Sequence, residues 1–490
     1  MPESTPRAAQ SPTSEAVTNF GLAVAITALA ASLCLGGCAV RPITPELAHY
    51  VPSGGYRWSP RRDLPDNDPR TLLILTFSGG GTRAAAFAYG VLEELRRTPV
   101  QGANGTTTPA LSQIDLVTGT SGGSFTALAY ALYGEKLFDF YDRTFLKRDI
   151  EGELLQRLFN PFRWPQVLSQ GFGRSELAEE YYDEILFHDA TYGDLLRKQT
   201  PVALVGATDV TTGSRLDFSQ STFDVMCGDL SRFPLSRAAA ASSAVPIVLS
   251  PVTLDNRGGS CGYHPPVWMA GAMELSEGRL TGNRAELRFR QLARLEDSRA
   301  RPYIHLVDGG LSDNLGLYGI VQALQEIMAN PEFRAAMITR GLRRVVVVVV
   351  NARSAPSFGF DKDPDGPGTF ALLMQSISVP IDRFSTEAIA ALHDIIAQWR
   401  LNERLDADER RLGEKIGPGG DIPPVEFSVI DVSFEAVADP KLREYLQNLP
   451  TSFALSDEAV DKLRATAAQL LHESPAFQKL VDELSRENLR

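Results

Sequence analysis

Apolar residues along this chain fall into short uninterrupted runs and longer helical repeats. An uninterrupted run is typical of a strand that is covered on both faces of a parallel sheet. The runs predict strands at Thr71–Phe77, Ile114–Thr118, Val202–Asp209, Tyr303–Val307, Arg344–Asn351 and Val425–Phe434, with Arg215–Phe218 as a hairpin partner of the third. Six consecutive valines, 345–350, lead us to expect that strand at the sheet centre.

Helical repeats occupy most of the sequence between these runs. They predict helices at Ala84–Arg97, Ser124–Tyr133, Ser236–Ala244, Leu317–Met328, Thr369–Arg400 (with a break at Pro380) and Leu455–Leu489 (interrupted near Pro475), and a mainly helical region over Tyr141–Leu196. Strand, turn and helix in series favour parallel strands joined by right-handed crossovers. The pattern therefore predicts an α/β protein with a mostly parallel central sheet flanked by helices.

The N-terminal apolar run, Gly21–Leu35, is shorter than the roughly 20 residues of a membrane-spanning helix and fits the centre of a signal peptide. It leads into Leu35-Gly36-Gly37-Cys38, which resembles the lipobox of bacterial lipoproteins, whose cysteine carries the lipid. Ala39 follows instead of Asp, which implies an outer-membrane destination. The preceding segment contains Glu3 and Glu15 and is not basic, so a plain cleaved signal or an anchor helix remains open.

Charge and cysteine content narrow the class of protein. The net charge of the 490 residues is −12 without a long basic run, which argues against nucleic acid as a partner. The four cysteines, Cys34, Cys38, Cys227 and Cys261, include no C-x-x-C pair and so do not indicate a thiolate zinc site. Cys227 and Cys261 form either a disulfide, if the body is exported, or two free thiols.

A serine lies in the turn between a predicted strand and a predicted helix. Gly119-x-Ser121-x-Gly123 fits the nucleophile elbow, in which a tight turn exposes the serine hydroxyl. Glycines on either side tolerate unusual dihedral angles and allow close approach of neighbouring segments. The N-terminus of the following helix favours negative charge on the attacking oxygen.

Three glycines follow the first predicted strand. Gly79-Gly80-Gly81 presents consecutive backbone N–H groups without side chains, as an oxyanion hole requires, and Arg83 is expected to stabilise the loop or add positive charge. A phosphate cradle is the alternative. We favour the oxyanion hole because no Gly-Lys-Ser/Thr follows and Ala84 interrupts the dinucleotide-binding pattern.

An aspartate ends a later predicted strand, in Asp308-Gly309-Gly310. Catalytic groups of parallel-sheet proteins lie at such strand ends. A carboxylate there can act as general base toward a serine, and partial burial would raise its pKa. On its own, Asp-Gly-Gly is more often an ordinary turn.

The three motifs in this order resemble the patatin-like phospholipase family, over roughly Thr71–Ala352. Further matches are Ala207-Thr208-Asp209, the 237–246 segment with Ala-Ser-Ser-Ala, and Asp313-Asn314-Leu315-Gly316. The chain departs from the family at Ser78, where many members have Asp, and at Ala84, where Gly is common.

The resemblance implies a three-layer fold and hydrolysis of acyl esters of membrane lipids by a Ser121–Asp308 dyad, without histidine, metal or cofactor. Gly79, Gly80 and Gly81 would hold the oxyanion. Arg83, Gly119, Gly123, Gly309 and Gly310 would support the site. The oligomeric state and the head-group preference stay open.

Two other functions are compatible with parts of this pattern. A Ser-His-Asp enzyme would need one of the six histidines, but His305 precedes Asp308 by three residues and would point to the opposite side of a strand. His393 lies on a helical pattern. A catalytically inactive envelope lipoprotein that binds lipids is the second alternative, and the presence of all three motifs argues against it.

Three other segments have a functional interpretation and a plainer one. Arg-interleaved aromatics at Phe159–Trp164 suit a membrane interface, and Phe370–Trp399 suits a lid, but we favour core packing for both. Asp361, Asp363 and Asp365 lack the closing Glu of a calcium loop and predict a solvated loop.

The sequence is thus divided into four parts. Residues 1–38 are expected to be a lipoprotein signal peptide, and 39–70 a Pro-rich tether or surface-hugging arm. Residues 71–352 form the catalytic core, and 353–490 a mostly helical extension packed on it. The expected location is the bacterial cell envelope, with the lipid on Cys38 anchoring the protein in the outer membrane.

Overall fold

The computed structural model describes residues 41–57, 64, 66–102, 105–167, 169, 171–265, 284–329, 341–355, 366–412 and 425–487. The predicted signal peptide with Cys38, and the loop with Asp361, Asp363 and Asp365, lie outside these residues. Among the described helices, none is both long enough and apolar enough to cross a bilayer.

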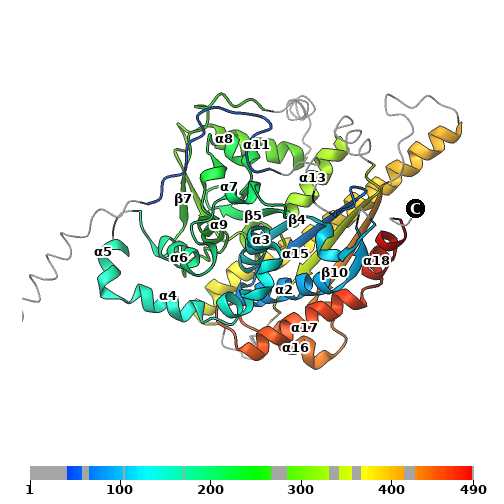
Figure 1. The fold of residues 1–490 in the computed structure, drawn as a ribbon. Helices are drawn as coiled ribbons and strands as arrows, with labels where there is room; N and C mark the ends of the chain where they lie inside the picture. Colours follow the sequence, from blue (N-terminus) through cyan, green and yellow to red (C-terminus); the bar gives the residue numbers. More distant parts are fainter. Residues whose placement is uncertain are drawn as a thin grey trace, which may run out of the picture.

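Strands and helices alternate along most of the described chain (Figure 1). The strands are β1 (Thr71–Phe77), β2 (Pro99–Gln101), β3 (Thr107–Pro109), β4 (Ile114–Thr120), β5 (Val202–Asp209), β6 (Arg215–Asp217), β7 (Val252–Asp255), β8 (Tyr303–Val307), β9 (Arg344–Asn351) and β10 (Glu426–Ser433). The first helices are α2 (Gly81–Arg97), α3 (Gly122–Tyr133), α4 (Ile150–Leu158), α5 (Trp164–Val167), α6 (Arg174–Tyr182), α7 (Tyr192–Leu196), α8 (Gln220–Val225) and α9 (Leu235–Ser242). The later helices are α11 (Arg284–Glu296), α12 (Gly310–Asp313), α13 (Tyr318–Ala329), α15 (Thr369–Leu412), α16 (Pro440–Gln447), α17 (Asp457–Glu473) and α18 (Pro475–Glu487).

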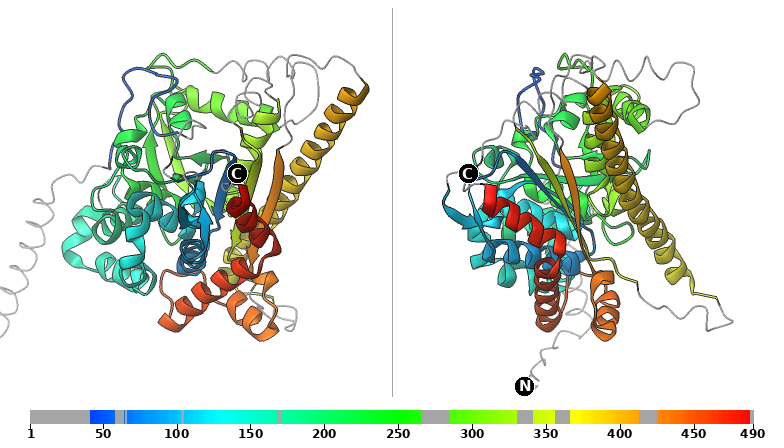
Figure 2. Two further views of the ribbon diagram at one scale, coloured as in Figure 1. Left: turned by 45° about the vertical axis from the view of Figure 1, so that its right-hand side comes forward. Right: turned by 90° about the vertical axis from the view of Figure 1, so that its right-hand side faces the viewer.

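A central sheet of eight strands is covered by helices on both faces. Its order is β10-β9-β1-β4-β5-β8-β7, and β6 pairs with β5. The right-hand view of Figure 2 shows α2 and α17 on one side of the sheet and α15 on the other. Both faces are therefore shielded from water, which explains why β1 and β9 are buried along their whole length and read as continuous apolar runs. The predicted α/β class with three layers is confirmed.

The sheet is mixed, with its parallel strands on one side and antiparallel strands on the other. Parallel pairs join β10, β9, β1, β4 and β5, whereas β8 is antiparallel to β5 and β7 is antiparallel to β8. The prediction of a mostly parallel sheet holds for the first group. Strand β7 was not predicted, because a run of four residues gives too little periodicity to recognise.

Three details of the sequence-based prediction were wrong. The valine strand β9 is not central, since only β10 lies beyond it. Strand β10 belongs to the sheet, so residue 352 is not a structural boundary. Pro380 lies inside one continuous helix, α15, rather than at a break. Proline removes one backbone hydrogen bond, and packing of α15 outweighs that loss.

Residues 41–57 lie along the body as a packed arm. Arg41 forms an ion pair with Asp255 of β7, and the backbone N–H of Thr44 donates to the same carboxylate. Tyr56 is fully buried, and its hydroxyl accepts from the N–H of Ala203 in β5. The first described residues are thus bound to the sheet.

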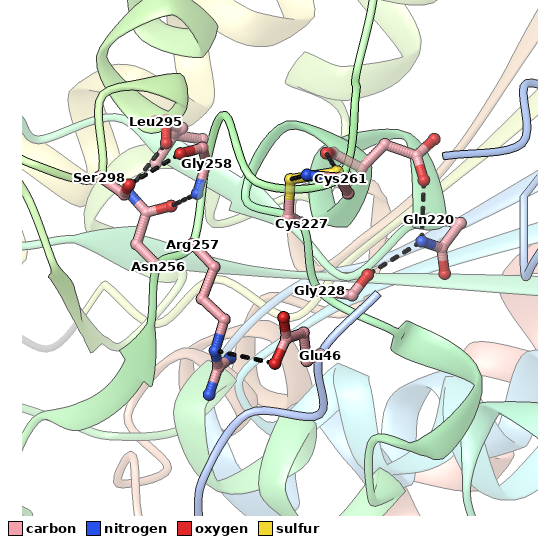
Figure 3. Close-up of a disulfide and its surroundings, with 11 residues drawn as sticks. Glu46, Gln220, Cys227, Gly228, Asn256, Arg257, Gly258, Cys261, Leu295 and Ser298 are labelled. Carbon is pink, nitrogen blue, oxygen red and sulfur yellow. Dashed lines mark hydrogen bonds and ion pairs between the residues drawn. A yellow bond between two sulfur atoms is a disulfide. The ribbon is translucent and has the colours of Figure 1, made fainter. Parts of the chain in front are cut away.

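Cys227 and Cys261 form a disulfide beneath this arm (Figure 3). Leu47 of the arm donates its N–H to the carbonyl of Cys227. Arg257, which lies between the two cysteines in the sequence, forms an ion pair of 3.8 Å with Glu46 of the arm. Of the two interpretations left open by the sequence, the structure contains the disulfide. It closes a loop of 34 residues that supports the arm.

Replacing both cysteines by serine is expected to lower the free energy of unfolding by about 3–4 kcal/mol, because the unfolded chain regains the entropy of the closed loop. Denaturant unfolding of the double variant and the wild type measures this difference. Non-reducing mass spectrometry is the control. Alkylation of both cysteines in the folded, unreduced wild type would contradict the pairing.

Candidate active site

Ser121 forms the whole turn between β4 and α3. The strand continues to Thr120 and the helix begins at Gly122, so the turn is shorter than the predicted five residues. Ser121 has φ 49° and ψ −122°. Residues other than glycine adopt this backbone conformation only at a cost in free energy. This backbone lifts the hydroxyl off the strand, and the N-terminus of α3 lies directly behind it.

The glycines around Ser121 are required by close contacts, not by their own dihedral angles. A Cβ on Gly119 would lie 2.7 Å from the carbonyl oxygen of Gly123. A Cβ on Gly123 would lie 2.6 Å from the carbonyl oxygen of Ser78. Neither glycine has a positive φ, so the backbone strain falls on Ser121 alone. The close packing brings the nucleophile turn against the end of β1.

The hydroxyl of Ser121 donates a hydrogen bond of 2.8 Å to Oδ2 of Asp308. Both side chains are buried, with residue exposures of 5% and 7%. Burial raises the pKa of Asp308 from 3.8 to about 6, although hydrogen bonds from the Gly310 N–H and from Ser121 oppose the shift. The carboxylate is therefore ionised at neutral pH and more basic than an exposed aspartate.

Asp308 reaches this position from the opposite direction to the predicted one. It follows β8, which is antiparallel to β5, with Val307 opposite Thr208. The last residue of β8 is therefore paired near the carboxyl end of β5. Asp308, which follows it, lies at the edge of the sheet where β4 and β5 also end. The expectation of a parallel strand was wrong for β8, and the expected location at the carboxyl edge was right.

Two residues without a predicted role hold the pair together. Oγ of Ser242, at the end of α9, accepts the N–H of Ser121 at 2.9 Å and donates to the carbonyl of Gly206 at 2.7 Å. Oγ1 of Thr208 donates to the carbonyl of Asp308 at 2.8 Å. Both residues lie in segments that resemble the family, Ala207-Thr208-Asp209 and 237–246. The sequence does not indicate what their hydroxyl groups contact, and the structure does.

The glycines after Asp308 have separate structural roles. Gly310 donates its N–H to Oδ1 of the carboxylate at 2.7 Å and begins α12. Gly309 donates its N–H to the carbonyl of Ser242 at 3.0 Å. The carboxylate is thereby held by a backbone donor on one oxygen and by Ser121 on the other.

Only part of the predicted oxyanion loop has free donors. The N–H of Gly79 donates to the carbonyl of Asn314 at 2.8 Å and is not available to a ligand. Within the described chain, no hydrogen bond takes the N–H of Gly80 or Gly81. Both glycines line the same cavity as Ser121. The prediction of three donors is corrected to Gly80 and Gly81.

Arg83 supports this loop from below. It is buried, and it donates to the carbonyls of Ala352 and Leu449 at 2.9 and 2.6 Å and to Oγ1 of Thr451 at 3.0 Å. Burial lowers the pKa of the guanidinium to about 10, so it stays protonated at neutral pH. Of the two predicted roles, stabilising the loop is the one that these contacts support.

A cavity of about 420 Å³ lies above Ser121, Asp308 and the glycine loop. This volume is within the range of roughly 300–1,000 Å³ that is typical of small-molecule sites. Its walls include apolar side chains of α4, α6, the loop after α9 and α15, among them Leu154, Leu177, Leu249 and Ile381. The site combines one reactive pair with a mostly apolar enclosure.

The histidines are all distant from this pair. All six are exposed, and none lines the cavity. His305 is bonded to Oγ1 of Thr253 at 3.0 Å. The described residues also include no group of three or more His, Cys, Asp or Glu side chains placed to hold a metal ion. The geometry provides a serine activated by a carboxylate, with two backbone donors beside it.

Comparison with known proteins identifies the family of the chain. A family profile described as patatin-like phospholipase matches residues 75–319, which is half of the chain. No curated protein sequence matches significantly. Among solved structures, human GIVD cytosolic phospholipase A2 is similar over 85% of this chain and 62% of its own, with 13% identity and a TM-score of 0.40.

Two bacterial structures are also similar. VipD from Legionella pneumophila matches 90% of this chain and 75% of its own, with 12% identity and a TM-score of 0.25. ExoU of the Pseudomonas aeruginosa type III secretion system, solved with SpcU, matches 56% of this chain and 61% of that chain, with 16% identity and a TM-score of 0.20.

Proposed function

Because this chain belongs to the patatin-like phospholipase family, we propose that it hydrolyses carboxylic esters of membrane lipids, with Ser121 as nucleophile and Asp308 as general base. The observation that carries the proposal is the 2.8 Å hydrogen bond from the Ser121 hydroxyl to the buried Asp308 carboxylate. The mostly apolar cavity above this bond suits an acyl chain.

In the first half of the reaction, Oγ of Ser121 attacks the ester carbonyl carbon while its proton passes to Oδ2 of Asp308. The carbonyl oxygen becomes an oxyanion, and the free N–H groups of Gly80 and Gly81 are placed to donate to it. The tetrahedral intermediate collapses with cleavage of the bond to the alcohol oxygen. That oxygen takes the proton from Asp308 and leaves as an alcohol, so that the acyl group stays on Ser121.

In the second half, water enters and Asp308 accepts one of its protons. The resulting hydroxide oxygen attacks the acyl carbon, and the bond to Oγ of Ser121 breaks. The serine oxygen recovers its proton from Asp308, and a free carboxylic acid is released. Atoms and charges balance over the two halves, and the carboxylate returns to its ionised state.

Activity is expected to require the ionised form of Asp308, whose pKa is raised by burial to about 6. The rate at low substrate concentration should be near its plateau above pH 7, half of it near pH 6, and fall about tenfold for each further unit of acid. A pH profile of kcat/KM on a soluble ester measures this. A profile that is flat down to about pH 4 would contradict the assignment.

For the location, the proposal is a protein tethered through a lipid on Cys38. Two observations support it. Arg41, three residues after the lipobox cysteine, forms an ion pair with Asp255 of the folded body. The disulfide between Cys227 and Cys261 is typical of an exported protein. Substitution of Cys38 by serine should release the protein from the membrane fraction, and unchanged retention would contradict the tether.

Labelling with a fluorophosphonate probe tests the catalytic proposal directly. The phosphorus of the probe bonds to an activated serine oxygen and displaces fluoride. Peptide mapping should place the adduct on Ser121. A folded, unlabelled protein that still binds lipid would favour the alternative of an inactive lipid-binding lipoprotein.

A further inference from the structure

Exposed apolar side chains lie on, or directly after, elements that line the active-site cavity. On α4 and the segment after it, Leu155, Phe159, Phe162 and Trp164 are 48%, 70%, 91% and 48% exposed. The loop after α9 and the first turns of α15 add Ile247, Val248, Leu372, Leu373 and Val379, all at least 45% exposed. An apolar surface gathered in this way marks an interaction site. The preference for core packing of Phe159–Trp164 was therefore wrong.

This surface is continuous with the cavity itself. Leu155 and Val248 are exposed and also line the cavity, whose inner end is formed by Ser121 and Asp308. A lipid that leaves a bilayer at this surface would meet these apolar side chains on its way to the nucleophile. The surface is thus placed where a lipid substrate has to enter.

The chain also enters the body on this side. The side chain of Arg41 lies against Gly171, four residues after the end of α5. Cys38 precedes Arg41 by three residues. A lipid on Cys38 would hold the α4–α5 side of the molecule close to the bilayer.

The two arginines between these exposed side chains are paired with carboxylates. Arg157 pairs with Glu184 and Arg163 with Glu180, both at 2.7 Å. The net charge of the whole chain is −12. These two arginines therefore contribute little attraction to anionic lipids, and burial of apolar side chains is the main source of binding in the proposal below.

We propose that Leu155, Phe159, Phe162 and Trp164, together with the exposed residues of α15 named above, form a face that inserts into the surface of a phospholipid bilayer. The face brings the cavity entrance against the lipid. The choice of a bilayer rests on the proposed lipid hydrolase function, whereas the insertion itself is measured independently of catalysis.

The first experiment places an environment-sensitive fluorophore on the full-length protein at Phe162→Cys. The matched control is Leu405→Cys, which is 52% exposed near the far end of α15, at the opposite end of the molecule from α5 (Figures 1 and 2). Phosphatidylcholine vesicles should shift the emission of the first label to the blue and leave that of the second unchanged. Vesicles that also contain phosphatidylglycerol should give the same result. No shift at position 162 would overturn the proposal.

The second experiment combines Phe159→Ser with Phe162→Ser. Both side chains are exposed, so the fold should be kept, and thermal unfolding verifies this. Hydrolysis of ester in phosphatidylcholine vesicles should fall by at least about tenfold, because the area that inserts is lost. Hydrolysis of a soluble short-chain ester should stay unchanged. The matched control, Leu401→Ser with Leu405→Ser, should affect neither substrate, and an equal loss in both double variants would overturn the proposal.

These outcomes separate the new face from the proposed function. A wild type that hydrolyses neither substrate contradicts the function, while the fluorescence shift still decides whether the face inserts. If a second copy of the chain covers the face, the label at position 162 will be shielded without vesicles, and sedimentation will show a dimer that the Ser double variant abolishes. That result would replace the bilayer as the occupant.

Discussion

Substitution of Ser121 by alanine is expected to reduce ester hydrolysis by about 10⁴-fold or more, because Ser121 is the cavity residue whose hydroxyl is hydrogen-bonded to the carboxylate that takes its proton. The hydroxyl is the donor to Asp308, and its removal leaves the carboxylate with the N–H of Gly310 as its remaining partner. Steady-state hydrolysis of vesicle lipid and of a soluble ester measures the loss. Both substrates should be affected equally, since the chemical step is common to them.

A serine remote from the cavity provides the matched control. Ser231 follows the cap residue Asp229, and Ser231→Ala should retain full activity. Thermal unfolding of both variants verifies the fold. The Ser121→Ala variant should keep the strain of the positive φ, because alanine has the same backbone preference as serine. Activity above a hundredth of wild type in a folded Ser121→Ala protein would refute the assignment.

Substitution of Asp308 by asparagine is expected to reduce hydrolysis by a comparable factor, about 10³–10⁴-fold. The amide keeps the shape of the side chain and cannot take a proton from Ser121. The remaining activity should lose the dependence on a group with a pKa of about 6. A pH profile of the variant therefore separates a lost base from a disturbed fold.

The same variant should be more stable than the wild type at neutral pH. Burial raises the folded pKa of Asp308 from 3.8 to about 6, so the neutral form stabilises the fold below pH 3.8, and this stability is lost as pH rises through 6. Asparagine is always neutral. The gain should be at most about 3 kcal/mol near pH 8 and vanish near pH 4. Denaturant unfolding at the two pH values measures it.

His305→Ala is the informative control for the dyad. The imidazole is exposed and bonded to Thr253, with no contact to Ser121. The variant should keep its activity, since the side chain does not line the cavity. An inactive, folded His305→Ala protein would contradict the dyad and favour a triad enzyme.

The α/β class and most of the strands could be predicted because both faces of the sheet are covered. Strands β1 and β9 are buried along their length, so nearly every residue in them is apolar. The register between β5 and β8 could not be predicted from the sequence. This register is what brings Asp308, at the end of β8, beside Ser121. Antiparallel pairing of Thr208 with Val307 depends on contacts between residues about 100 positions apart, and no local pattern encodes such contacts.

The sequence alone determined which residues are candidates for the chemistry. Ser121, Asp308 and the glycine loop could be found because each lies in a short motif with strong local backbone requirements. The tertiary structure decided how those groups are used. The carbonyl of Asn314 accepts a hydrogen bond from the N–H of Gly79, which leaves the N–H groups of Gly80 and Gly81 as donors. The structure also decided that Phe159 and Phe162 are exposed, because a side chain is buried only when another element covers it, and no element of the described chain covers these two rings.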